Sequence, residues 1–120
     1  MLQHHIFPKD YCIKCGYDKR KWNSVVNKTP LSYATNREIG GISPSKYLSK
    51  IEVKGQVASE MLNIYLESHF IDVLSCRNDD FDTYFKKRAI SLLDAIEKAT
   101  GKPISGRNGE DVIKEFGCEL

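Results

Sequence analysis

The chain has 120 residues and a formal net charge of +2, with 41% hydrophobic and 28% charged residues. These values are typical of one globular domain and exclude a disordered or low-complexity chain. No apolar run approaches the roughly 20 residues that a membrane-spanning helix needs, and the N-terminus lacks the basic flank and apolar core of a signal peptide. We therefore expect a cytoplasmic protein, whose four cysteines are thiols or metal ligands rather than disulfide partners.

Charge is unevenly distributed along the chain. Residues 1–52 carry nine Lys and Arg against four Asp and Glu, a balance of +5. Residues 53–120 carry nine against twelve, a balance of −3. A basic first half beside an acidic second half indicates an anionic partner for the first half, although solvated basic loops give the same pattern.

The first half of the sequence predicts short elements. A brief apolar stretch ends at Pro8, residues 9–24 have no helical or alternating period, and Ser43-Pro44 has the form of a helix cap followed by proline. In chain order we expect a strand over 2–7, a loop over 9–24, an irregular strand over 25–32, a short helix over 33–39 ended by Gly40-Gly41, and a helix from 43 to about 51.

The second half predicts helices that form core and support rather than a chemical site. Apolar residues recur at helical spacing, and Asp80 supplies a cap at the start of the strongest stripe, which Gly101 ends. The expected helices cover 57–66, 81 to about 99, and 110–116.

The residues that can carry chemistry lie in the first forty positions. His4 and His5 are adjacent on the expected first strand, so one imidazole can bind a metal while the other handles protons. Asn27 falls in the second strand, and Asn36 lies nine residues later in the short helix, followed by Arg37. Together these residues describe a ββα-metal arrangement. The alternative is that the histidines are ordinary strand residues and the asparagines cap turns.

Three stretches resemble the HNH endonuclease family. The string His-His-Ile-Phe-Pro-Lys from His4 resembles the first motif of the family, and the double histidine before proline is similar to that of colicin DNases. Residues 27–37 resemble the second half of the motif, with a spacing between asparagines similar to that of RNA-guided CRISPR nucleases. Residues 40–48 resemble the C-terminal HNH module of modification-dependent restriction enzymes and related phage-defence proteins. The resemblance covers about residues 2–103 and is strongest up to 48.

The resemblance implies a role for each residue of the motif. His5 is the general base that takes a proton from water, and Asn27 holds the loop that orients it. His4 and Asn36 bind one divalent ion (Mg, Mn or Ni), which stabilises the developing charge and the leaving 3′ oxygen. Many members have Asp at the position of His4, and imidazole, as the softer ligand, favours Mn, Ni or Zn over Mg. Arg37 contacts a phosphate oxygen.

The fold class implied by the resemblance is α+β, with an HNH ββα-metal core over residues 1–52. A helical extension over 53–120 is expected to pack on this core in a single compact domain. The implied activity is metal-dependent hydrolysis of DNA phosphodiester bonds, in defence, restriction or a mobile element. A partner protein that supplies targeting fits a small nuclease of this kind. The alternatives are a zinc-stabilised nucleic-acid-binding module without cleavage and an interaction subunit whose helices dock a partner.

The cysteines form a second group of candidate residues. Cys12-x-x-Cys15 followed by Gly16 has the spacing of half a tetrahedral zinc site. Cys76 and Cys118 complete a structural site if the helical tail folds back over the loop. The alternative is that all four are ordinary thiols. No βαβ pattern surrounds the pair, which disfavours a redox site.

A basic run follows the cysteine pair. Lys19, Arg20 and Lys21 can neutralise phosphates along a nucleic-acid backbone. The neighbouring Trp22 can stack on an unpaired base, but the sequence favours a place in the small core. His69 has no partner motif, and we expect it to be a helix-end residue rather than a ligand.

Overall fold

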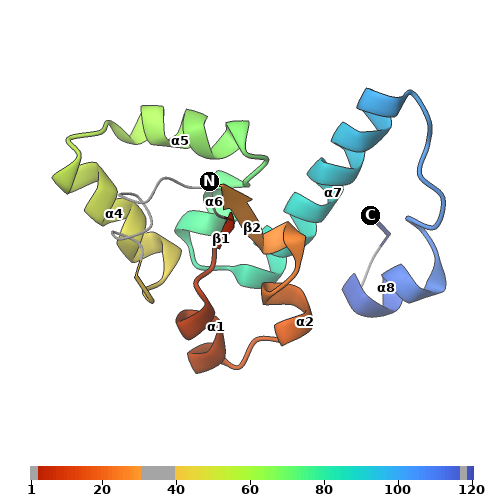
Figure 1. The fold of residues 1–120 in the computed structure, drawn as a ribbon, viewed down its shortest axis with the longest axis horizontal. Helices are drawn as coiled ribbons and strands as arrows, with labels where there is room; N and C mark the ends of the chain where they lie inside the picture. Colours follow the sequence, from red (N-terminus) through yellow and green to blue (C-terminus); the bar gives the residue numbers. More distant parts are fainter. Residues whose placement is uncertain (1–2, 31–39, 117–118) are drawn as a thin grey trace.

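The computed structural model describes residues 3–30, 40–116 and 119–120, which form a mostly helical molecule with one two-stranded sheet (Figure 1). The α+β class expected from the sequence is therefore confirmed. In chain order the elements are β1 (Gln3–His5), α1 (Lys9–Cys15), α2 (Lys19–Trp22), the 3-10 helix η1 (Val25–Asn27), β2 (Lys28–Pro30), α4 (Pro44–Lys54), α5 (Ser59–Ser68), α6 (Val73–Arg77), α7 (Phe81–Thr100) and α8 (Glu110–Phe116). No helix of the described ranges is long and apolar enough to cross a membrane.

β1 and β2 form an antiparallel two-stranded sheet, the hairpin, whose strands are joined through α1, α2 and η1. His4 lies opposite Thr29, and His5 lies opposite Lys28. The pairing continues one step beyond the strands, where the Ile6 N–H donates to the Asn27 carbonyl oxygen at 2.8 Å. The second strand begins later than expected, at Lys28, because η1 takes up residues 25–27.

The loop expected over 9–24 is wrong, because α1 and α2 occupy most of it. Pro8 starts α1 with a φ of −61°, and Gly16 ends it in the left-handed conformation with a φ of 77°. The Asp18 carboxylate then caps α2 by accepting from the Arg20 N–H. α1 and α2, of seven and four residues, show no hydrophobic period, so only their caps could have indicated them.

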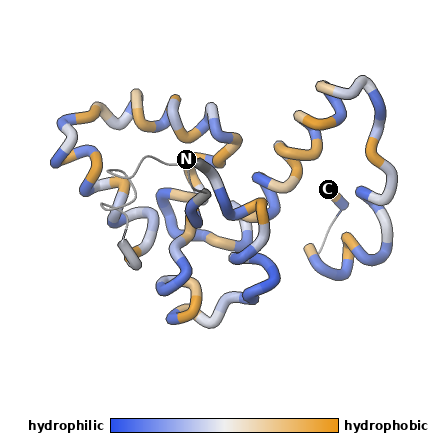
Figure 2. Tube along the Cα trace, viewed as in Figure 1, coloured by the Kyte–Doolittle hydropathy of each residue, from blue (hydrophilic) through white to orange (hydrophobic). Residues whose placement is uncertain are grey.

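The longer helices agree with the sequence. α4 begins at Pro44, α8 covers the expected 110–116, and α7 begins after Asp80, whose carboxylate accepts from the Thr83 N–H, and ends at Gly101. Figure 2 shows apolar and polar residues interleaved along α7, the pattern from which it was predicted. α6 was not predicted, and the helix expected over 33–39 lies outside the described residues.

The hydrophobic core joins the two halves of the chain. Phe7, two residues after β1, packs its ring 5.3 Å from Phe81 and 4.6 Å from Tyr84 of α7. Trp22 is only 4% exposed, which confirms its place in the core. Aromatic burial of this kind stabilises the packing of α7 against the first half of the chain.

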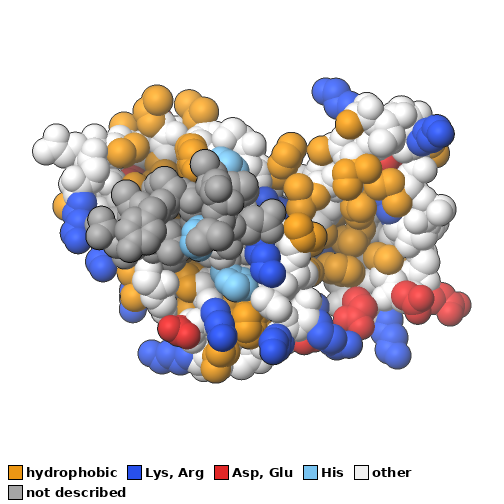
Figure 3. Space-filling view, in the orientation of Figure 1, with side chains coloured by type: hydrophobic (Ala, Val, Ile, Leu, Met, Phe, Trp, Pro, Cys, Tyr) orange, Lys and Arg blue, Asp and Glu red, His pale blue; other side chains and the backbone are white. Residues whose placement is uncertain are grey.

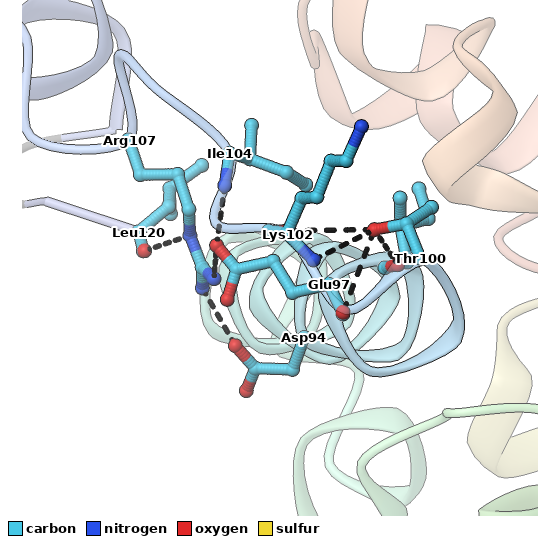
Figure 4. Close-up of polar contacts among 8 residues, drawn as sticks. Asp94, Glu97, Thr100, Lys102, Ile104, Arg107 and Leu120 are labelled. Carbon is cyan, nitrogen blue, oxygen red and sulfur yellow. Dashed lines mark hydrogen bonds and ion pairs between the residues drawn. The ribbon is translucent and has the colours of Figure 1, made fainter.

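Ion pairs and a hydrogen bond of Arg107 attach the C-terminal segment to α7 (Figure 4). The Arg107 guanidinium lies 2.8 Å from an Asp94 oxygen and 3.0 Å from a Glu97 oxygen. Its Nε also donates to the carbonyl oxygen of Leu120 at 2.6 Å. In addition, the ring of Phe116 on α8 stacks on Phe85. The end of the chain therefore returns to the same long helix that carries the core.

Candidate functional site

His5 is held by a neighbour in a way that determines which nitrogen is available. Its Nε2 lies 3.1 Å from the Asn23 Oδ1, and the edge of its ring meets Trp22 at a centroid distance of 5.5 Å. A carbonyl oxygen can only accept, so Nε2 carries the proton and Nδ1 presents a lone pair. The partly exposed ring is thus arranged to accept a proton at Nδ1.

The Asn27 side chain is fully buried and makes four hydrogen bonds. Its Nδ2 donates to the carbonyl oxygens of Phe7 and Trp22, each at 2.9 Å. Its Oδ1 accepts from the Phe7 N–H at 2.9 Å and from the Tyr84 hydroxyl at 2.8 Å. Burial raises the pKa of Tyr84 well above its usual value, so this hydroxyl remains a donor. The Asn27 amide therefore fixes the backbone of Phe7, two residues after His5. Its role in orienting His5 stays a prediction.

A buried arginine attaches α7 to the backbone of η1 and β2. Arg88 is 5% exposed, and its NH1 donates to the carbonyl oxygens of Val25, Val26 and Lys28. Its Nε and NH2 donate to the carbonyl oxygen of His69. Burial lowers the pKa of this guanidinium from its usual value, and the surrounding carbonyl oxygens replace the lost water.

His4 has a different neighbourhood from His5. It pairs with Thr29, so both side chains leave the hairpin on the same face. The Thr29 Oγ1 lies 3.0 Å from the Nδ1 of His69, the residue that caps the C-terminal end of α5. His69 is a helix-end residue, as expected, but it has a partner that sequence reasoning missed. No local pattern could have indicated a contact across 40 residues.

Three predicted site residues lie outside the described residues: Asn36, Arg37 and Cys118. Of the other cysteines, Cys12 and Cys76 are buried in the core and Cys15 is exposed at the end of α1. Within the described ranges no three His, Cys, Asp or Glu side chains are grouped as a metal site requires. The four-cysteine zinc site stays a prediction.

The basic run lies on α2, where two of its three side chains already have partners. Arg20 pairs with Asp18 at 3.0 Å and holds the pKa of that carboxyl below its usual value. The Lys21 ammonium lies 5.9 Å from the ring centre of Phe85. Lys19 is exposed, and its ammonium has no ion-pair partner among the described residues.

Two open grooves border α7, with volumes of about 570 and 710 Å³. Both include Phe70 and Ser91 in their lining. Neither contains a residue that the sequence selected as catalytic, metal-binding or DNA-binding. The candidate site is therefore the surface around the hairpin, next to a small apolar cavity of about 40 Å³ whose lining includes Thr29 and His69.

The first prediction concerns Asn27. Asn27→Asp keeps the shape of the side chain but places an oxygen against the carbonyl oxygens of Phe7 and Trp22. We expect a loss of roughly 3 kcal/mol in the free energy of unfolding, measured with urea. The matched variant Tyr84→Phe removes one hydrogen bond to the same amide and should cost about 1 kcal/mol. Equal, small losses in the two variants would show that the amide is not central to stability.

The second prediction concerns thiol reactivity. Burial raises the pKa of both Cys12 and Cys76 to about 12, so neither forms thiolate near neutral pH. In the native protein, iodoacetamide should label Cys15 well before Cys12 or Cys76, and unfolding in urea should equalise the three rates. Peptide mapping measures this order, with Cys15→Ser as the control. Protection of Cys15 together with bound zinc by elemental analysis would instead favour a zinc site.

Comparison with known proteins gives one relative of unknown activity. An uncharacterized protein of Methanocaldococcus jannaschii is 41% identical over 76 residues, which are 58% of this chain and 13% of that protein. The match thus spans a small part of a much longer relative. No family model matches the chain, and no solved structure matches it significantly.

Proposed function

We propose that the chain is a metal-dependent endonuclease of the HNH type, which hydrolyses phosphodiester bonds of DNA. The observation that carries the proposal is the set of hydrogen bonds that holds His5 and the backbone next to it. The buried Asn27 amide bonds both the N–H and the carbonyl of Phe7, while Asn23 holds the Nε2 of the His5 ring. Such an arrangement positions a histidine accurately at the surface, as a general base requires.

His5 acts on the attacking water in this mechanism. Its Nδ1 lone pair accepts a proton as the water oxygen forms a bond to phosphorus, and Asn23 stabilises the resulting imidazolium through Nε2. The bond between phosphorus and the 3′ oxygen breaks, and solvent supplies the proton for that oxygen. The products are a 5′-phosphate, which keeps the oxygen from water, and a 3′-hydroxyl.

His4 and Asn36 are the proposed metal ligands. An imidazole nitrogen and an amide oxygen form a donor set suited to Mn, Ni or Mg completed by water. A metal ligand must be accessible, and the ring of His4 is partly exposed on the hairpin, next to His5 in sequence. A divalent ion held there supplies electrostatic stabilisation of the charge that develops on the phosphate and the leaving oxygen.

The nucleic-acid backbone is proposed to pass α2. Lys19 is exposed there and can contact a phosphate directly. Arg20 must leave Asp18, and Lys21 must leave the ring of Phe85, before either contacts a phosphate. Arg37 is a further proposed phosphate contact. The match to one part of a much longer relative is compatible with targeting by other protein segments or by a partner protein.

The third prediction tests cleavage directly. Purified protein should nick supercoiled plasmid in the presence of Mg, Mn or Ni, and His5→Ala should lower the rate by roughly 10²- to 10⁴-fold with DNA binding unchanged. Agarose gels measure nicking, and mobility shifts in EDTA measure binding. Binding without cleavage in every metal would instead favour the non-cutting nucleic-acid-binding module. A fully active His5→Ala variant would remove His5 from the mechanism.

The fourth prediction concerns the residue that holds His5. Asn23→Leu removes the acceptor at Nε2, so the ring loses its fixed tautomer, and kcat should fall roughly 5-fold. Asn23→Asp retains an acceptor oxygen at this position and should keep most of the activity. Plasmid nicking at saturating DNA measures kcat, and the melting temperature serves as the control for folding. Equal rates for the Leu variant and the wild type would contradict a positioning role.

A further inference from the structure

His69 reaches the proposed site from the helical extension. Its Nδ1 bonds the hydroxyl of Thr29, and Thr29 lies directly opposite His4 on the same face of the hairpin. Figure 3 shows histidine side chains gathered on one face of the molecule. An imidazole at the end of α5 is therefore one side chain away from the proposed metal ligand, although more than half of the chain length separates them in the sequence.

His69 is held at three points. Arg88 donates two hydrogen bonds to its carbonyl oxygen, at 3.3 and 3.1 Å. Thr29 fixes the Nδ1 side of the ring, and Tyr65 packs against the ring at a centroid distance of 4.7 Å. The ring is partly exposed, and its Nε2 has no hydrogen-bond partner within the described ranges. Because Thr29 holds the Nδ1 side of the ring, Nε2 is the nitrogen that remains to bind a ligand.

Arg88 brings a positive charge to the backbone of His69. Its guanidinium is buried, donates to the carbonyl oxygen of His69, and has no carboxylate partner among the described residues. A positive charge held beside the residue attracts an anion. Thr29 can donate its hydroxyl proton to Nδ1, which leaves the ring N–H on Nε2 to donate outward.

We propose that His69 is a phosphate contact of the nucleic-acid site, with its Nε2–H donating to a non-bridging oxygen of the backbone beside the hairpin. The proposal deepens the nuclease proposal and depends on it for the identity of the anion. It also assigns a function to the helical extension, because α5 carries the contact and Arg88 of α7 holds its backbone.

Two substitutions separate this role from a structural one. In His69→Asn the amide occupies the place of Nδ1, so the bond to Thr29 is retained while nothing remains at the Nε2 position. In His69→Gln the amide reaches the Nε2 position, but the bond to Thr29 is lost. We expect DNA affinity, measured in EDTA with a short duplex, to fall roughly 10-fold for the Asn variant and to stay near wild type for the Gln variant. Melting temperature should show the reverse order.

The outcomes distinguish this proposal from the nuclease proposal. Unchanged DNA affinity in the Asn variant, or the same order of the two variants in affinity and melting temperature, overturns the contact at His69. Weaker Ni²⁺ binding by the Asn variant in calorimetry without DNA, with unchanged DNA affinity, would instead make His69 a metal ligand. Plasmid cleavage by the wild type tests the nuclease proposal separately. Loss of affinity in the Asn variant of a protein that never cleaves would support the contact and reject the nuclease.

Discussion

The buried amide of Asn27 is the constraint on which the site region depends. Its four hydrogen bonds join the backbone of Phe7, the carbonyl oxygen of Trp22 at the end of α2, and the hydroxyl of Tyr84 on α7. Each partner is a backbone or hydroxyl group that would be costly to bury without a bond. A side chain with both donors and an acceptor is needed here, so neither a carboxylate nor an apolar residue can take its place. The same four bonds keep the backbone beside His5 in one position.

Arg88 has the corresponding role for the helical extension. Its guanidinium binds carbonyl oxygens from η1, β2 and the end of α5, and so connects three segments at one buried charge. The desolvation of that charge is offset by carbonyl dipoles rather than by a carboxylate. Arg88 of the extension therefore holds the backbone of η1 and β2 in place, in addition to the contribution of α7 to the core.

The long periodic helix α7 could be predicted from apolar spacing and caps, and α4 from its N-terminal Ser-Pro pair. The short α8 was expected and α1 and α2 were not. The segments of α1 and α2 were expected to be a loop, because their apolar residues show no helical period. Asn27 was selected as a loop-holding residue from its motif, whereas Asn23 was not selected, since an asparagine before a short 3-10 turn has no distinguishing local pattern.

The sequence by itself determined the α+β class, the long helices and the neighbouring histidines of the hairpin, because periodicity, caps and adjacent residues are local properties. Only the tertiary structure decided which nitrogen of His5 is held and which residues surround Thr29. These contacts join residues that are distant along the chain, such as His69 and Arg88, and they exist only once the core has packed α5 and α7 against the hairpin. Side-chain hydrogen bonds of this kind depend on positions accurate to a fraction of an ångström, which no sequence pattern specifies.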